Sequence, residues 1–190
     1  MEPDVAFIEK FLAREEADAL LDRIRSESEF KQNQINLYGW KNVPRLEAWY
    51  GPWDYPYANG VVLKAAPMPG YLQAVIDRIA EAGFGSYNAV LINRYRDGKD
   101  YISAHSDDDY GDDKPTIPSL TLGAARPFRL AKWLVKYKKL DKSTTVEYMP
   151  GHGDLLVMRG ITNVEWGHWV PKTAKQVGER IILTFRNKEV

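Results

Sequence analysis

Two stretches near the start of the chain, residues 4–28 and 69–83, repeat apolar residues at helical spacing. This spacing gathers the apolar side chains on one face and predicts an amphipathic helix in each stretch. The first helix would bury Phe7, Phe11, Ala17, Leu20, Leu21 and Ile24, and the second would bury Leu72, Val75, Ile76 and Ile79.

The segment between the two helices, residues 29–66, has a different pattern. It is rich in glycine, proline, tryptophan and tyrosine. Glycine and proline interrupt helices and mark turns, whereas aromatic residues favour strands. We therefore expect short strands joined by turns.

The pattern is strand-like from residue 86 onward. Short runs rich in β-branched and aromatic residues are separated by Gly, Pro or Asp turns. Several short strands at such spacing are typical of a β-sandwich or barrel. We expect helices and short strands packed on a C-terminal jelly roll as one cooperative unit. The runs are NAVLINRY, TIPSLTLG, RPFRLAKWLV, TTVEYM, DLLVMRG and RIILTFR.

Length and composition narrow the chemistry. With 190 residues, 44% of them hydrophobic and 27% charged, the chain fits one ordered globular domain. It contains no cysteine, so disulfides and thiolate-bound metals are excluded. A metal would have to be held by histidine, aspartate or glutamate, and the chain has only three histidines.

The net charge of the chain indicates how it could contact nucleic acid, and its apolar segments indicate where in the cell it is expected. Lys and Arg total 26, and so do Asp and Glu, so the formal net charge is zero. Proteins that hold nucleic acid mainly through counterion release usually carry a basic excess, so nucleic-acid contact is expected from a local patch and a pocket. The first residues lack a signal-peptide pattern, and no run of about 20 apolar residues predicts a membrane span. We expect a soluble intracellular monomer of the cytoplasm, nucleus or nucleoid, with no membrane contact.

His105 and Asp107 are separated by one residue. In a strand, side chains at i and i+2 project from the same face, so one metal ion can reach both. His168 is the preferred third ligand, because His152 lies in a glycine-rich turn that is more simply a loop before the next strand. Two histidines and one carboxylate form the facial triad of non-haem Fe(II) oxygenases, which leaves positions open for cosubstrate and oxygen.

Two arginines in the last predicted strand, Arg180 and Arg186, are an even number of residues apart. We expect their guanidinium groups on one face, where they are costly unless an anion such as 2-oxoglutarate meets them. Asn93 and Tyr95 alternate in the same way. The alternatives are surface arginines on an edge strand and a core tyrosine with a satisfied hydroxyl.

The chain order of these residues resembles the AlkB family of dioxygenases. The runs LINRYRDGKDYISAHSDDD, GDLLVMRG, TNVEWGHWVP and ERIILTFR are most similar to its double-stranded-DNA repair branch. The resemblance is dense over residues 88–186 and looser over 34–60. In order, the residues that carry it are Asn93, Tyr95, His105, Asp107, His168, Arg180 and Arg186.

This resemblance implies an α+β fold in a single domain, 1–190. A double-stranded β-helix core would occupy residues 86–190, and helices with a nucleotide-recognition lid would occupy residues 1–85. It also implies an enzyme that uses Fe(II), 2-oxoglutarate and O2 to demethylate bases such as N1-methyladenine and N3-methylcytosine in alkylated DNA or RNA. Formaldehyde, succinate and carbon dioxide would be released.

Residue roles follow from the same resemblance. The family commonly has an asparagine two residues after the first arginine, where this chain has Ile182. One hydrogen bond to the cosubstrate is then missing, and we expect weaker binding or compensation by water. His105, Asp107 and His168 would bind Fe(II), Arg180 and Tyr95 would hold the distal carboxylate of 2-oxoglutarate, and Arg186 and Asn93 would serve its iron-chelating end.

Five further residues resemble substrate-binding positions of the family. A carboxylate near a cationic methylated base favours it over the neutral base, and Asp109 holds this position in an acidic run that is otherwise typical of a solvated loop. Aromatic residues would stack on a flipped base. The others are Tyr55 and Tyr57 over the pocket, Arg45 at its rim and Tyr38 as a wedge, and a lid packed with aromatics is the alternative.

Lysines gather in one predicted hairpin, interleaved with Trp133 and Tyr137. In a chain with zero net charge, this local excess is typical of a phosphate-binding patch, and a solvated hairpin is the alternative. The lysines are Lys132, Lys136, Lys138, Lys139 and Lys142.

Other functions use part of this pattern. An AlkB-like hydroxylase or demethylase of a protein or small molecule would keep every metal and cosubstrate residue, and the zero net charge favours it slightly. A non-catalytic binding module would not need the triad, and a zinc hydrolase would leave Arg180 and Arg186 unexplained. The lysines and tyrosines favour a nucleic-acid demethylase.

Overall fold

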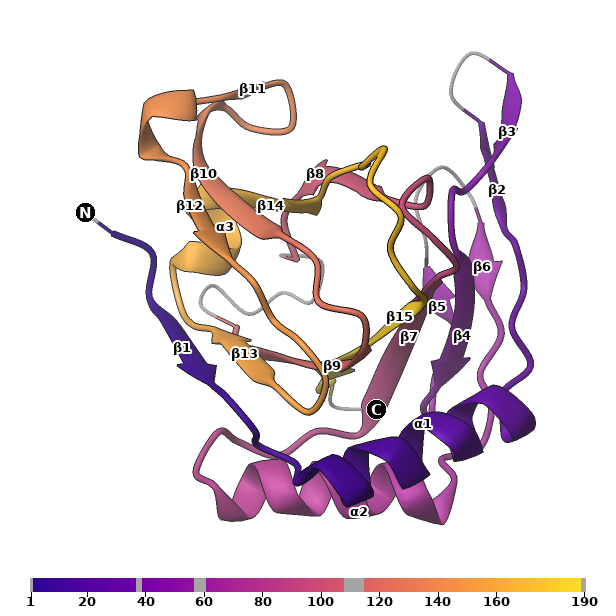
Figure 1. Cartoon of the computed structure of the whole chain (residues 1–190). Helices are drawn as coiled ribbons and strands as arrows, with labels where there is room; N and C mark the ends of the chain where they lie inside the picture. The colour runs from indigo at the N-terminus through magenta and orange to yellow at the C-terminus, as the bar shows by residue number, and fades with distance from the viewer. Residues whose placement is uncertain (1, 37–38, 57–60, 108–114, 189–190) are drawn as a thin grey trace.

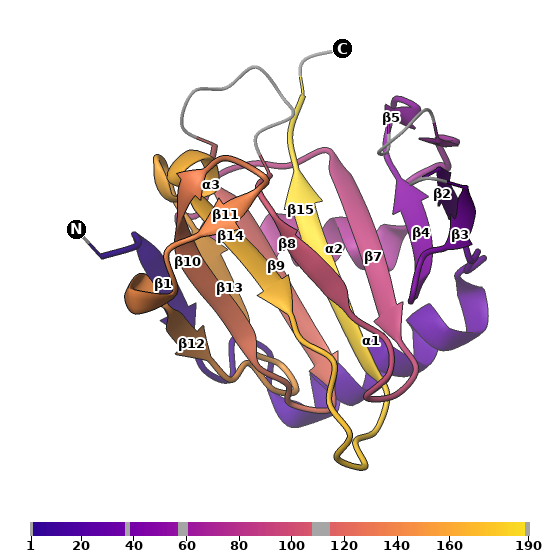
Figure 2. The ribbon, with the colours of Figure 1, turned by 90° about the horizontal axis from the view of Figure 1, so that it is seen from above.

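The computed structural model describes residues 2–36, 39–56, 61–107 and 115–188. Two antiparallel sheets curl against each other as a jelly roll, and two helices cover the outer face of the larger sheet (Figures 1 and 2). The larger sheet has the order β1-β13-β9-β15-β7-β4. Its strands are β1 (Val5–Ile8), β4 (Leu46–Tyr50), β7 (Ala89–Tyr95), β9 (Ile117–Gly123), β13 (Leu155–Met158) and β15 (Arg180–Arg186).

The second sheet has the order β11-β10-β14-β8, and β12 also pairs with β10. Its strands are β8 (Ile102–His105), β10 (Phe128–Val135), β11 (Lys139–Leu140), β12 (Val146–Tyr148) and β14 (Trp166–Val170), with a 3-10 turn at Lys142–Thr144 and a short helix α3 at Thr162–Glu165. The segment predicted to form short strands gives two small sheets, made by β2 (Gln34–Asn36) with β3 (Trp40–Asn42) and by β5 (Tyr55–Pro56) with β6 (Val62–Leu63).

Alternation along the strands divides the core into two layers. On β15, Ile181, Leu183 and Phe185 pack in the layer shared with the helices, whereas Ile182 packs in the layer between the sheets. The same alternation turns every second side chain of β15 toward the space that the sheets enclose. This inner face carries Arg180 and Arg186.

The helices α1 (Arg14–Glu27) and α2 (Gly70–Glu81) confirm the predicted apolar faces. Both pack on the six-stranded sheet, so the apolar stripe of each is covered. No helix in the described part of the chain is long and apolar enough to span a membrane. The buried positions are Ala17, Leu20, Leu21 and Ile24 in α1 and Leu72, Val75, Ile76 and Ile79 in α2.

The prediction of a helix from residue 4 was wrong for its first part. Residues 5–8 form strand β1, which pairs antiparallel with β13 from Val5↔Met158 to Ile8↔Leu155. Phe7 therefore packs on Tyr148, with ring centroids 5.8 Å apart, and not on a helix face. Pairing with β13, which is distant in the sequence, determines the conformation of this segment, and the local spacing of apolar residues cannot predict that pairing.

Strands β1 and β4 form the two edges of the larger sheet, although both come from the residues that were expected to form the helices and the lid, 1–85.

Candidate metal centre and cavity

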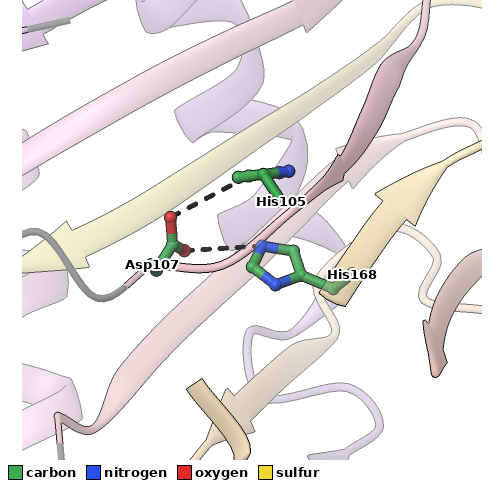
Figure 3. A group of neighbouring side chains, drawn as sticks. All are labelled: His105, Asp107 and His168. Carbon is green, nitrogen blue, oxygen red and sulfur yellow. Dashed lines mark ion pairs between the residues drawn. The ribbon is translucent and has the colours of Figure 1, made fainter. Parts of the chain in front are cut away.

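His105, Asp107 and His168 converge on one point between the sheets (Figure 3). His105 ends β8, Asp107 follows it by two residues, and His168 lies directly opposite His105 on β14. One potential ligand atom from each residue lies within 4.8 Å of the others. His168 Nε2 is 3.5 Å from Asp107 Oδ2, and His105 Nε2 is 3.9 Å from Asp107 Oδ1. The cross-strand pairing thus brings together the three residues that the sequence singled out.

The protonation states of this group suit a metal. Burial lowers the pKa of His168 to about 3 and also lowers that of His105. Burial alone would raise the pKa of Asp107, but the charge of Arg186, which also donates a hydrogen bond to this carboxylate, outweighs burial and holds the pKa below its usual range. At neutral pH the group therefore offers two neutral imidazoles and one carboxylate, which are the forms that bind a divalent metal. This donor set fits Fe(II).

A cavity of about 730 Å³ opens beside the three residues. This volume lies in the range of sites that bury a small molecule. Residues of both sheets and of the β2–β3 hairpin line it. The predicted site residues along its wall are Arg45, Tyr55, Asn93, Tyr95, His105, Asp107, His168 and Arg186, and Ile182 lines it as well.

Arg180 is a buried cation without a carboxylate partner among the residues that the structure describes. Its Nη1 donates to the Arg126 carbonyl at 3.0 Å and its Nη2 to Thr121 Oγ1 at 3.2 Å. Burial lowers its pKa to about 10. A buried guanidinium held only by neutral acceptors is costly, and an anion beside it would remove much of this cost.

The pairing of β15 with β7 places Arg180 opposite Tyr95 and Ile182 opposite Asn93. Burial raises the pKa of the Tyr95 hydroxyl, so this group remains a neutral donor. Arg186 is also buried, and its Nη2 donates to Asp107 Oδ1 at 2.7 Å. Asn93, Tyr95 and Arg186 thus line the cavity, with Arg186 next to the metal-ligand group, whereas Arg180 adjoins this wall as the cross-strand partner of Tyr95 and is not among the lining residues.

Arg45 belongs to a buried polar network. Its Nε donates to Asn93 Oδ1 at 2.8 Å, and its Nη2 lies 2.8 Å from Glu47 Oε1. Asn33 Nδ2 donates to the other oxygen of Glu47 at 2.7 Å. Because Asn93 uses its oxygen for Arg45, its amide NH2 is the end left to donate. The sequence analysis missed Glu47, although it is two residues after Arg45 in the same strand-rich stretch and so shares its face.

Glu47→Ala is expected to reduce the free energy of unfolding by about 3–5 kcal/mol, because it leaves Arg45 as a buried charge without this carboxylate. Glu147→Ala is the matched control, since its pair with Arg129 is exposed (39% and 41% of the side chains). Loss of such a pair is expected to change stability by less than about 1 kcal/mol. Urea unfolding of both variants measures the difference, and equal small losses would contradict a structural role for the buried pair.

The predicted substrate residues are only partly described. Tyr55 is buried at the cavity wall, stacked on Trp49 with ring centroids 4.7 Å apart. The Arg186 guanidinium lies 5.7 Å from the centroid of the Tyr55 ring. Tyr38, Tyr57 and Asp109 lie outside the described residues.

His152, the third histidine, does not join the metal-ligand group. Its Nδ1 accepts the Gly123 N–H at 2.9 Å, and its Nε2 lies 3.1 Å from Asp18 on helix α1. The imidazole therefore ties the loop before β13 to α1 and β9.

The predicted lysine-rich hairpin is formed by β10 and β11, which pair through Trp133↔Leu140 and Val135↔Lys139. It stands on the side of the barrel away from the β2–β3 hairpin (Figures 1 and 2). Both hairpins contribute to the cavity wall, through Tyr137 and Lys41 among others. Tyr137 keeps 53% of its surface exposed, and Lys138 and Lys139, which follow it in the chain, are exposed as well.

Comparison with known proteins gives consistent results. Residues 4–186 match the model of the 2OG-Fe(II) oxygenase superfamily. The chain is 33% identical over 179 residues to the human DNA oxidative demethylase ALKBH2, an alignment that covers 90% of this chain and 68% of that protein. It is 35% identical over 183 residues to the rat alpha-ketoglutarate-dependent dioxygenase alkB homolog 3, covering 93% of this chain and 61% of that protein. The solved structure of OsALKBH1 shares the fold, with a TM-score of 0.68, 15% identity and coverage of 98% of this chain and 99% of that one.

Proposed function

Because this chain belongs to the 2OG-Fe(II) oxygenase superfamily and, within it, to the AlkB homologues, we propose that it removes methyl groups oxidatively from N-alkylated bases of nucleic acids. The observation that carries this proposal is one cavity that contains the His-Asp-His group and whose wall includes Tyr95, the cross-strand neighbour of the buried Arg180. Two of the relatives are named DNA oxidative demethylases, which supports a nucleic acid as the substrate.

His105, Asp107 and His168 are the residues that would hold Fe(II). When bound, Fe(II) with 2-oxoglutarate and O2 supplies the oxidising chemistry that releases a methyl group as formaldehyde, with succinate and carbon dioxide as coproducts. Arg186 fixes the carboxylate of Asp107 by its contact with Oδ1, which leaves Oδ2 toward His168. A ligand oriented in this way by its neighbour needs little rearrangement to bind a metal.

Arg180 and Tyr95 would bind the distal carboxylate of 2-oxoglutarate, deep in the barrel. Arg186 and the amide NH2 of Asn93 would serve the end nearer the metal. Ile182 lies between the two arginines on the inner face of β15, so it provides an apolar wall in place of a hydrogen-bond donor. We expect weaker binding of 2-oxoglutarate, or a water molecule that makes the hydrogen bond that Ile182 cannot make.

Tyr55 would provide a stacking surface for the methylated base. One side of its ring is buried against Trp49, which fixes the ring, and the residue lines the cavity. Aromatic stacking contributes about 1–3 kcal/mol per base and is tolerant of base identity. The buried pair of Arg45 and Glu47 adds no net charge at this rim, so it does not repel a cationic methylated base.

Succinate formation with and without a methylated oligonucleotide tests this proposal. We expect succinate formation to depend on Fe(II) and to rise when N1-methyladenine or N3-methylcytosine is present, compared with the same unmethylated sequence. Succinate that no oligonucleotide stimulates would direct the substrate search to proteins and small molecules. Absence of succinate from folded, iron-loaded protein would overturn the metal and cosubstrate assignment.

Replacement of two hairpin lysines, Lys138→Gln with Lys139→Gln, is expected to lower the affinity for an oligonucleotide. It should also make that affinity less dependent on salt concentration. Each lost phosphate contact should lower the slope of log K against log salt by about 0.7–0.9. Lys10→Gln with Arg14→Gln removes the same charge just before and at the first residue of helix α1, which packs on the outer face of the larger sheet (Figure 1). Fluorescence anisotropy across a salt series measures both slopes, and equal changes in the two double variants would exclude the hairpin as the phosphate contact.

A further inference from the structure

Ser106 lies in the chain between His105 and Asp107, two of the proposed metal ligands, and is not itself a ligand. It is 5% exposed, and its hydroxyl makes two hydrogen bonds. It accepts from Trp133 Nε1 at 2.8 Å and donates to the Trp166 carbonyl at 3.1 Å. One hydroxyl therefore links the end of β8 to β10 and to β14. These contacts hold the residue between His105 and Asp107 in place.

Trp133 also packs against the residue that precedes the third ligand. A Cβ added at Gly167 would lie 2.4 Å from Cζ2 and 2.7 Å from Cε2 of the Trp133 ring. Atoms do not approach that closely, so the indole occupies the space where a side chain at this position would be. Gly167 is adjacent to His168, so the same indole contacts both the Ser106 hydroxyl and the backbone of the residue before the third ligand.

The pairing of β8 with β14 shows why this support matters. The two strands are in register at His168↔His105 and Val170↔Ile102, with an irregularity between these pairs. The regular pairing is therefore interrupted between the facing histidines and the Val170↔Ile102 pair. The Trp133–Ser106–Trp166 chain of hydrogen bonds lies just beyond the last pair and connects the strands a second time.

We infer that Trp133 and Ser106 form a brace that positions the metal ligands, an inference that rests on the proposed Fe(II) site. Neither residue is one of the proposed metal ligands. Trp133 holds the Ser106 hydroxyl and the backbone at Gly167, and these fix the relative placement of His105, Asp107 and His168. Partners that hydrogen-bond to the ligands themselves typically change metal affinity by about 10- to 100-fold, and a brace that acts through the backbone should lie near the lower end of this range.

Anaerobic titration with Co(II), followed by calorimetry and by the visible absorption of the bound ion, tests the brace without turnover. Ser106→Ala is expected to raise the Kd for Co(II) about 10-fold. Ser106→Thr keeps the hydroxyl and should restore most of the affinity. Trp133→Phe keeps most of the ring and removes the indole donor, so it should raise the Kd by a smaller factor in the same direction.

The control is Tyr87→Phe, which removes a hydroxyl that donates to the Phe84 carbonyl at 2.7 Å, away from the metal-ligand group. It should lower the thermal stability of the metal-free protein without changing the Kd. Because Ser106→Ala and Trp133→Phe break the same hydrogen bond, their effects on the Kd for Co(II) should be less than additive in the double variant.

Two outcomes separate this inference from the proposed metal site. If the unaltered protein binds Co(II) but Ser106→Ala and Trp133→Phe lose only stability, as Tyr87→Phe does, the brace is overturned and the site stands. If Asp107→Ala binds Co(II) as well as the unaltered protein, the proposed metal site itself fails.

Discussion

The His168→Ala variant is expected to lose metal binding and 2-oxoglutarate turnover together. His168 provides one of the three donor groups that converge in the described part of the chain, and its ring lies 4.2 Å from that of His105 between the two sheets. Without it, two ligands remain and the ion is held weakly. A bound metal contributes several kcal/mol to stabilising the transition state, so turnover should fall on the order of 10³-fold or more.

His152→Ala is the matched control, because it makes the same substitution at the one histidine of the sequence that is not a proposed metal ligand. His152 accepts the Gly123 N–H, so its loss should lower stability by about 1 kcal/mol and leave succinate formation unchanged. Both variants are measured by succinate formation at saturating Fe(II) and by Co(II) titration. Full turnover in His168→Ala, or its loss in His152→Ala, would mean that the third ligand is wrongly assigned.

Arg180→Met is expected to raise the KM for 2-oxoglutarate on the order of 100-fold, since each hydrogen bond to a charged group contributes about 1.5–3 kcal/mol. The same change should not destabilise the metal-free protein by more than about 1 kcal/mol, because it removes a buried charge that has only neutral acceptors. This combination of weak cosubstrate binding and retained stability distinguishes a binding residue from a structural one.

Two further variants sharpen the Arg180 prediction. Arg180→Lys keeps the charge without the two-pronged geometry and should give an intermediate KM. Arg129→Met removes an exposed arginine of β10 that pairs with Glu147, and it should leave the KM unchanged. Steady-state succinate formation over a range of 2-oxoglutarate concentrations measures all three. An unchanged KM in Arg180→Met would exclude Arg180 as the anchor of the distal carboxylate.

Much of the architecture could be predicted because the strands alternate cleanly. On β15, every second residue from Ile181 packs toward the helices, and this places Arg180 and Arg186 on the inner face. Strand alternation likewise predicted that His105 and Asp107 share a face, although Asp107 lies just beyond the end of β8. These features follow from local geometry, which sequence reveals.

Features set by distant contacts could not be predicted in the same way. Strand β1 depends on its pairing with β13, so its apolar residues resemble a helical pattern when they are considered alone. Trp133 and Ser106 are 27 residues apart, and their hydrogen bond exists only because β10, β14 and β8 are neighbours. Glu47 could have been found, since alternation alone places it on the face of Arg45.

The most direct test of the account is mass spectrometry of methylated oligonucleotides incubated with the protein, Fe(II), 2-oxoglutarate, O2 and ascorbate. The panel contains N1-methyladenine and N3-methylcytosine in single-stranded DNA, double-stranded DNA and RNA, with succinate followed in the same samples. We predict that a methyl group is replaced by hydrogen on at least one substrate, only when 2-oxoglutarate is present, with succinate formed and with no reaction in His168→Ala. Abundant succinate with every methylated base unchanged would contradict base demethylation as the function of this protein.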